Sequence, residues 1–499
     1  MSSNKELSLK QIMDFRKAKI EKFLEMGINP YPYSFEKNNN SLEIIENYDE
    51  LKDSSVSIAG RIISIRKMGK ASFFHVQDQQ AKIQVYIKRD DIGENQYSMF
   101  KFLDIGDIVG VIGKVFKTNT KEISINCDEI QLLSKSIRPL PGGKEKDGEV
   151  YNAFQDKEQR YRNRYIDLIV NPNVKKDFIN RAKIISSIRS FLDNNSFLEV
   201  ETPILQQIYG GAFARPFITK HNALNQNFFL RISDELYLKR LVAGGLDGVY
   251  EISKVFRNEG IDRNHNPEFT MLEFYKAYVD YFFMMDFVEL LIRAVAKETG
   301  ITTINIADQH IDLNEPFDRV SFMDLLNNAI GEDLTFASEE DLKKLCSKKH
   351  IELEKGAHLG RIYEVLMREF VEPKLLRPTF VIDYPKVISP LAKIKRDGNK
   401  DVVERFELFV GGAELANAFS ELNDPIDQRE RFETQVKLKD KGDQEAHSFD
   451  EDFLQSVEIG MPPMGGVGIG IDRLVMLLTG KVNIKDVILF PTMRPQDDE

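Results

Sequence analysis

The chain has 499 residues, of which 42% are hydrophobic and 29% charged, a globular composition that excludes a mainly disordered protein. It has no run of about 18 apolar residues, no apolar signal segment at its polar start, and only two cysteines, Cys127 and Cys346. These features exclude a membrane-spanning helix and a disulfide framework, and we expect a cytoplasmic protein. The net charge of the chain is −11, but residues 1–140, with 21 Lys+Arg and 19 Asp+Glu, are slightly basic and could bind phosphates.

Residues 1–54 are predicted to form a helical N-terminal extension. Apolar residues recur at helical spacing between residues 8 and 26, and Gly27 and Pro30 end the pattern. A solvated amphipathic helix is the simpler interpretation, although its lysines and its arginine could also contact RNA.

Residues 55–137 have the pattern of a small β-barrel. Ile83, Val85 and Ile87 alternate with polar residues, and about five short strands with glycines between them suit the five-stranded oligonucleotide-binding (OB) type. Aromatic and basic residues on such a barrel can stack on bases and meet phosphates. Of the neighbours Phe73 and Phe74, one should be core and the other exposed.

Residues 138–157 are rich in glycine, proline and charge, which indicates a hinge. A second domain is then predicted over residues 158–499. Its segment around 310–400 is rich in helical patterns and has few residues that suggest catalysis or binding. We therefore interpret it as a helical insertion.

Two β-like runs around residues 250–259 and 262–275 predict a hairpin. Arg257 and Glu259 should share one face of the first strand, and Phe269, Glu273 and Tyr275 should share one face of the second. Each residue alone could form a surface ion pair. Together they place an arginine, an aromatic ring and several acids on one sheet surface.

Glu407, Glu414 and Glu421 recur every seven residues in an otherwise apolar, strand-like segment. Acids there are costly to bury unless they meet a cation, and carboxylates suit Mg²⁺. Further along, the glycines of residues 465–470 allow close approach to a ligand, and Arg473 begins an apolar helix where it can meet a polyphosphate. The glycine spacing differs from that of a dinucleotide-binding loop.

These segments resemble motifs 2 and 3 of the class II aminoacyl-tRNA synthetases, and residues 196–203 resemble motif 1. Among these enzymes the chain is most similar to the lysyl-tRNA synthetases, on the stretches Tyr209-Gly-Gly-Ala, Arg231-Ile-Ser-Asp-Glu235 and Glu421-Leu-Asn-Asp. The resemblance implies an α+β fold: the N-terminal OB barrel, then a catalytic domain built on a mostly antiparallel sheet flanked by helices. It also implies a homodimer.

The resemblance assigns roles residue by residue. The catalytic residues would be Arg257, Glu259 and Arg473. The ATP-binding residues would be Arg257, Glu259, His265, Phe269, Glu407, Glu414 and Arg473, with Glu407 and Glu414 holding Mg²⁺. The lysine-binding residues would be Gly211, Glu235, Arg257, Glu273, Tyr275, Asn417, Phe419 and Glu421. The anticodon-binding residues would be Phe73, Gln84 and Glu122.

The implied reaction uses ATP to attach L-lysine to the 3′ end of tRNA(Lys) through a lysyl-adenylate. A buried ammonium group needs nearby carboxylates, which Glu273 and Glu421 would supply, so both must share one cavity with no cationic side chain on its floor. Three alternatives remain open: a synthetase for aspartate or asparagine, an enzyme that attaches lysine to a protein, and a non-catalytic RNA-binding protein.

Overall fold

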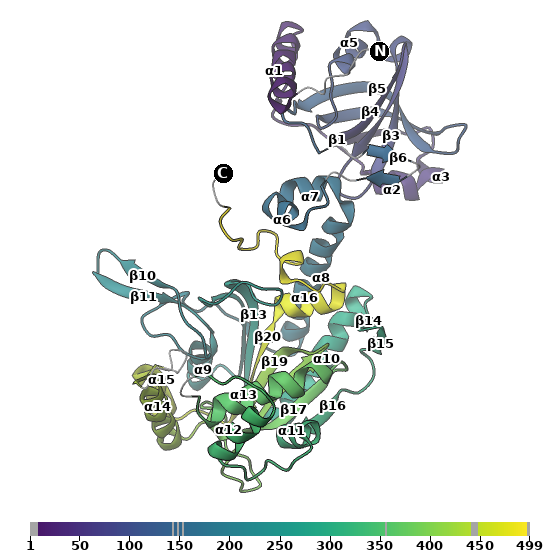
Figure 1. Ribbon diagram of the computed structural model, residues 1–499. Coiled ribbons are helices and arrows are strands. Elements are labelled where there is room, and N and C mark those ends of the chain that lie inside the picture. The colour runs from purple at the N-terminus through teal and green to yellow at the C-terminus, as the bar shows by residue number, and fades with distance from the viewer. Residues whose placement is uncertain are drawn as a thin grey trace. The chain divides into compact units, whose positions relative to one another are not determined.

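The computed structural model describes residues 8–141, 144–146, 149–151, 154–354, 357–440 and 448–496 (Figure 1). The chain divides into two compact units, Met1–Asp156 and Lys157–Glu499. The segment expected to be a hinge lies partly outside the described residues. Its described part includes two paired strands, β6 (Lys144–Lys146) and β7 (Glu149–Tyr151).

The first unit contains a closed barrel with the strand order β1-β2-β3-β5-β4, which confirms the five-stranded OB prediction. In β3 the alternating Ile83, Val85 and Ile87 are buried, whereas the polar residues between them are not. The period-two sequence pattern therefore directs one face of the strand into the barrel core. The strands are β1 (Ser55–Met68), β2 (Ala71–Gln77), β3 (Lys82–Lys88), β4 (Ile108–Lys117) and β5 (Ile123–Ser134).

One helix of 17 residues and four shorter ones accompany the barrel in the described part of the first unit. The first begins with a capping box in which the Ser8 and Gln11 side chains accept each other's backbone N–H groups. Its Phe23 is buried, but Phe15 is 62% exposed, so only part of the apolar stripe reaches the core. The helices are α1 (Leu9–Glu25), α2 (Ser41–Glu46), α3 (Tyr48–Leu51), α4 (Arg89–Ile92) and α5 (Glu94–Lys101).

The second unit is built on a sheet that has eight strands among the described residues (Figure 1). Only the outermost pairs, β16 with β17 and β8 with β12, are parallel, which confirms the mostly antiparallel prediction. In spatial order the strands are β16 (Asp318–Ser321), β17 (Thr379–Pro385), β18 (Val402–Val410), β19 (Ala413–Ser420), β20 (Met464–Gly470), β13 (Glu268–Ala277), β12 (Gly248–Phe256) and β8 (Leu198–Glu199).

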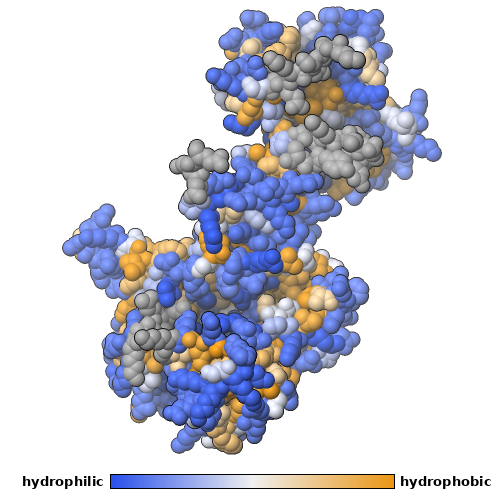
Figure 2. All heavy atoms as spheres, in the orientation of Figure 1, coloured by the Kyte–Doolittle hydropathy of each residue, from blue (hydrophilic) through white to orange (hydrophobic). Residues whose placement is uncertain are grey.

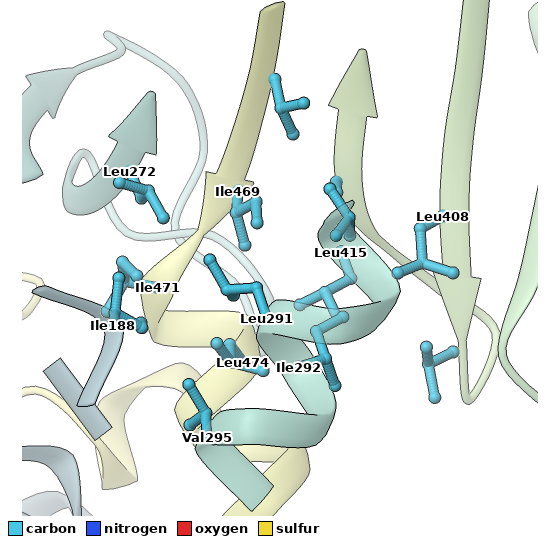
Figure 3. Close-up of a cluster of buried hydrophobic side chains, with 14 of the residues drawn as sticks. Ile188, Leu272, Leu291, Ile292, Val295, Leu408, Leu415, Ile469, Ile471 and Leu474 are labelled. Carbon is cyan, nitrogen blue, oxygen red and sulfur yellow. The ribbon is translucent and has the colours of Figure 1, made fainter. Parts of the chain in front are cut away.

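One face of this sheet packs on helices. Side chains from six of its strands, β12, β13, β17, β18, β19 and β20, meet α8, α10 and α16 in a single apolar core. Figure 3 shows Leu291 and Val295 of α10 among Ile469 of β20 and Leu474 of α16. The opposite face therefore remains for other contacts, and the α9 helix covers part of it at β12 and β13.

Eleven α-helices belong to the described part of this unit: α6 (Lys157–Arg162), α7 (Arg164–Val170), α8 (Pro172–Asn194), α9 (Glu235–Ala243), α10 (Tyr281–Thr299), α11 (Phe322–Ile330), α12 (Glu339–Lys348), α13 (Leu359–Phe370), α14 (Pro425–Asp440), α15 (Glu451–Glu458) and α16 (Ile471–Thr479). The single-turn helices are η1 (Glu372–Lys374), η2 (Lys386–Ile388) and η3 (Ile484–Asp486). The remaining strands are β9 (Leu205–Gln206), β10 (Ile218–His221), β11 (Gln226–Leu230), β14 (Thr303–Ile306) and β15 (Gln309–Asp312).

The segment expected to be a helical insertion is helical over a narrower range. Its helices α11, α12 and α13 span residues 322–370, whereas β16 and β17 on either side belong to the main sheet. Four-residue β16 was too short to produce a visible period-two pattern in the sequence.

Hydrophilic residues cover most of the surface visible in Figure 2, with smaller apolar areas among them. Across the described ranges, no helix combines the length and the apolar character that a membrane span requires.

Candidate active site

A cavity of about 620 Å³ lies in the second unit, on the sheet face opposite the apolar core. This volume is within the range of roughly 300–1,000 Å³ usual for small-molecule sites. Every residue predicted to bind ATP or lysine lines it: Gly211, Glu235, Arg257, Glu259, His265, Phe269, Glu273, Tyr275, Glu407, Glu414, Asn417, Phe419, Glu421 and Arg473.

Strand alternation separates the cavity from the core. On β13, Leu272 and Phe274 belong to the core, whereas Glu273 and Tyr275 face the cavity. The same division holds on β18, where Phe406 is in the core and Glu407 lines the cavity. The period of two therefore supplies the apolar support and the polar lining from the same four central strands.

A β-bulge is needed to bring Glu414 to the cavity. Glu414 and Asn417 are three residues apart, so regular alternation would place them on opposite faces of β19. The register slips between Ala416, paired with Leu408, and Glu414, paired with Phe409, so Leu415 is the extra residue. Leu415 is buried in the core, and Glu414 joins Asn417 in the cavity.

The hairpin formed by β12 and β13 matches the prediction, except at its tip. β12 ends at Phe256, so Arg257 and Glu259 lie in the loop and not on a strand face. They still reach the cavity, because Arg257 donates its backbone N–H to the Pro267 carbonyl across the hairpin. The guanidinium carbon lies 5.1 Å from the Phe269 ring centroid, and Nε has no acceptor among the described residues.

The positively charged side chains at the end of the cavity near Arg257 favour the binding of a polyphosphate. Arg473 lies in the first turn of α16, as predicted, and donates to the Glu414 carbonyl at 2.7 Å. Its Nη2 is 3.4 Å from Nε2 of His265, whose Nδ1 is 2.8 Å from Asp262 Oδ2. Arg257, Arg473 and His265 thus present cationic or donor groups to one space.

Glu407 and Glu414 could hold a divalent cation. Burial raises the pKa of Glu407 to about 7; Arg405, at 2.6 Å, opposes this shift, and Glu414 adds to it. Burial and then Glu414 likewise raise the pKa of the nearby Glu372 to about 7. In the described chain no three His, Cys, Asp or Glu side chains are placed to hold a metal by themselves. Two repelling carboxylates beside a phosphate site nevertheless fit Mg²⁺, which takes its other ligands from phosphate and water.

Glu273 is held firmly at the opposite end of the cavity. Its Oε1 accepts from Ser233 Oγ at 2.8 Å, and its Oε2 accepts from the Tyr275 hydroxyl at 2.9 Å. The Asp234 backbone N–H adds a third donor at 3.2 Å. These bonds fix a buried carboxylate that carries little free acceptor capacity of its own.

Glu421 is 1% exposed and lies in the same cavity as Glu273, as the sequence interpretation required. Its Oε2 forms an ion pair with Lys239, and Oε1 has no hydrogen-bond donor among the described residues. The second requirement, a floor without a cation, is not met as stated. Lys239 is 1% exposed and lies behind the cavity wall, paired with Glu235 at 2.5 Å and with Glu421.

Burial raises the pKa of all three acids at this end, Glu235, Glu273 and Glu421. Lys239 opposes the shift for Glu235 and Glu421, whereas Glu235 increases it for Glu273. Among the described residues, the three carboxylates at this end therefore outnumber Lys239, the cation that pairs with two of them.

The barrel carries a second polar cluster on its outer face. Phe74 is buried and Phe73 is partly exposed, which confirms that one of this pair is core. Phe73 lies opposite Tyr86, with ring centroids 4.9 Å apart. Beside this pair, Gln84 Nε2 donates to Glu122 at 2.8 Å and Gln84 Oε1 accepts from the buried Ser124 hydroxyl at 2.9 Å. The Gln84 amide is thereby fixed next to an aromatic platform.

Several cavity residues were not singled out from the sequence. Arg405 could have been found, because it is two residues before Glu407 and must share its face. Arg361 and Arg368 of α13 are seven residues apart and so share a helix face, but nothing in the sequence indicated that this face meets the cavity. Lys239 follows Glu235 by one helical turn, yet its link to Glu421 depends on tertiary packing.

Comparisons with known proteins agree with this geometry. The family model for class II tRNA synthetases (D, K and N) matches residues 156–494, and the model for the OB-fold nucleic acid binding domain matches residues 56–133. The chain is 51% identical to the lysine–tRNA ligase of Moorella thermoacetica, over 98% of each chain. It is 50% identical to the lysine–tRNA ligase of Thermoanaerobacter pseudethanolicus, over 99% of this chain and 98% of the relative. The same identity holds for the lysine–tRNA ligase of Carboxydothermus hydrogenoformans, over 98% and 99%. The chain therefore belongs to the class II tRNA synthetases, within the family of lysine–tRNA ligases.

Proposed function

We propose that this protein activates L-lysine with ATP and transfers it to the 3′ end of tRNA(Lys), in the cytoplasm, where tRNA is charged for translation. The observation that carries the choice of amino acid is the free Oε1 of Glu421, a buried acceptor without a donor among the described residues. A buried carboxylate oxygen in a cavity calls for a cationic group on the ligand. The side-chain ammonium of lysine is such a group. Glu273 and Tyr275 line the same cavity and would lie beside it.

In the first step the lysine carboxylate attacks the α-phosphorus of ATP and pyrophosphate leaves. Arg257 is placed to hold these two anions together, because its guanidinium faces the cavity and its Nε has no acceptor in the described part of the chain. Phe269 offers a ring for the adenine, and Glu259 lies near it. Positioning and charge stabilisation then supply most of the acceleration, and the protein needs no nucleophile.

Arg473 and His265 would contact the outer phosphates as charge accumulates on the departing pyrophosphate. Glu407 and Glu414 would hold Mg²⁺, which neutralises phosphate charge when it is bound. Gly211 and Glu235 would receive the α-ammonium group, and Asn417 and Phe419 would line the side-chain pocket with Glu421. These assignments rest on the shared cavity and on the family resemblance.

The barrel would read the anticodon. Phe73 and Tyr86 provide a stacking surface, and Gln84 and Glu122 form a fixed hydrogen-bonding pair beside it. An intact RNA-binding unit favours a tRNA substrate over attachment of lysine to a protein. The complete set of Arg257, Glu414 and Arg473 favours an enzyme over a non-catalytic RNA-binding protein.

We infer that two copies associate through the motif 1 region. Several large hydrophobic side chains between residues 198 and 224, a stretch that begins at the edge strand β8, are exposed to solvent. They are Leu198, Ile204, Leu205, Ile208, Ile218 and Leu224.

Charging of purified tRNA with labelled amino acid tests the proposed function directly. We expect ATP-dependent charging with lysine, together with lysine-dependent exchange of pyrophosphate into ATP. Aspartate and asparagine, the other two amino acids of the family model, should not support exchange. Exchange with either of them in place of lysine would refute the proposal.

Lysine binding should release protons from the acidic end of the cavity. Because burial raises the pKa of Glu421 and Glu273, their protonated forms compete with the lysine ammonium group, which favours the ionised forms. Lysine affinity should therefore rise with pH above the usual titration range of a glutamate, by up to about tenfold per pH unit for each proton released. Titration calorimetry in buffers of different ionisation enthalpy measures the release.

The matched control is Glu268→Gln, which removes an exposed glutamate from the same strand as Glu273 and should leave proton release unchanged. Glu421→Gln should reduce it. Lysine binding without any proton release in the unmodified protein would contradict this electrostatic account.

Gly466→Ala should block the lysine pocket. An added Cβ would lie 2.2 Å from Glu421 Oε1 and 2.2 Å from Tyr275 Cε1, and both groups are buried. Overpacking of this kind costs about 1–3 kcal/mol, so we expect KM for lysine in pyrophosphate exchange to rise by about 5- to 150-fold. Gly470→Ala on the same strand meets nothing closer than 3.7 Å and serves as the control. Equal effects of the two changes would rule out the pocket wall as the cause.

Phe73→Ala should weaken tRNA binding without changing lysine activation. Loss of one stacking partner costs about 1–3 kcal/mol, or about 5- to 150-fold in tRNA affinity. Filter binding of tRNA and pyrophosphate exchange without tRNA measure the two properties separately. Phe336→Ala removes a 95% exposed ring from the other unit and should change neither. Unaltered tRNA affinity in Phe73→Ala would exclude this platform as the anticodon contact.

A further inference from the structure

Lys239 is a buried cation behind the amino-acid end of the cavity, and the adenylation chemistry does not use it. Its ammonium contacts Glu235 at 2.5 Å and also pairs with Glu421, so it bridges acids from α9 and from the end of β19. Aromatic rings enclose it on other sides, with Phe419 at 5.0 Å and Tyr275 at 5.9 Å from Nζ to ring centroid. Such a group is costly to bury unless opposite charges meet it, and the two glutamates supply them.

The charges at this end do not balance within the protein. Glu235, Glu273 and Glu421 supply three carboxylates, and Lys239 supplies one ammonium group. The nearby Arg405 is committed elsewhere, to Glu407 at 2.6 Å and to the Ile388 carbonyl at 2.6 Å. When all three acids are ionised, a deficit of two positive charges remains among these described groups, and lysine carries two ammonium groups, one on the α-carbon and one on the side chain.

Lys239 also determines which oxygen of Glu421 is available. It occupies Oε2, and the remaining Oε1 lies next to Gly466 and the Tyr275 ring on the cavity side. The substrate ammonium therefore meets a carboxylate whose orientation is already fixed by an internal ammonium on its other oxygen.

We propose that Lys239 is a positioning and specificity-determining residue, an internal counter-ion that orients Glu421, favours its ionised form and leaves two of the three acids to be neutralised by the two ammonium groups of one lysine molecule. The inference rests on the proposed function, since it concerns how the lysine site selects its substrate. Lys239 itself does not touch the substrate, because it lies behind the wall formed by Glu235 and Glu421.

Pyrophosphate exchange with the full-length Lys239→Met variant tests this role. Truncation of one partner of a buried charge pair should raise KM for lysine at least about 30-fold, with a much smaller change in KM for ATP. Without the cation, Glu421 ionises at higher pH, so the pH dependence of lysine affinity should move upward by on the order of one unit. The other titratable or charged groups facing this site are Glu235 on α9, Glu273 and Tyr275 on β13, and Arg405 on β18.

Lys239→Arg keeps the charge and should retain the pH profile of the unmodified protein with a modest loss of lysine affinity. Lys254→Met removes a partly exposed lysine from β12 and should leave both Michaelis constants and the profile unchanged. If Lys239→Met does not fold, the Lys239→Arg profile decides, and its displacement would overturn the proposal.

An unchanged lysine KM and pH profile in folded Lys239→Met would overturn the proposal while lysine-dependent exchange in the unmodified protein still supported the proposed function. Equal loss for lysine and ATP would also overturn it, because that result indicates a structural role only. Absence of lysine-dependent exchange in the unmodified protein would instead refute the proposed function.

Discussion

Three buried glutamates and the internal lysine that pairs with two of them are the constraint on which the site depends. Buried carboxylates are tolerated only where hydrogen-bond donors or cations contact them. Here the acids differ in the groups that contact them. Glu273 is saturated by hydrogen bonds from Ser233 and Tyr275, whereas Glu421 keeps one oxygen without a protein donor among the described residues. The imbalance is an incomplete charge network that a cationic amino acid can complete.

The sheet holds these buried acids in place. Its core face packs against α8, α10 and α16, so the strands that carry the acids are held by a large apolar cluster. Its other face brings phosphate-binding arginines and the acidic pocket into one cavity. Because adenylation depends on holding two anions together, a rigid sheet that fixes both ends of the cavity is itself part of the chemistry.

The alternation of residues made much of this predictable. Glu273 and Tyr275 could be assigned to one face from their spacing alone, and the barrel followed from short alternating runs such as Ile83 to Ile87. The resemblance to known motifs then indicated which acids and arginines converge, which spacing could not do for segments more than 100 residues apart. The prediction that Arg257 lies on a strand face was wrong. The residue at which a strand ends depends on its pairing with the neighbouring strand, and β12 ends at Phe256.

The sequence by itself determined the two faces of the strands and the supply of charged groups, since side-chain direction in a strand has a period of two and needs no knowledge of distant residues. Only the tertiary structure decided the contacts between remote segments. It introduced the bulge at Leu415 that turns Glu414 into the cavity, and it placed Lys239 of α9 against Glu421. Both depend on how separate elements pack, and packing is a property of the whole core that local spacing does not encode.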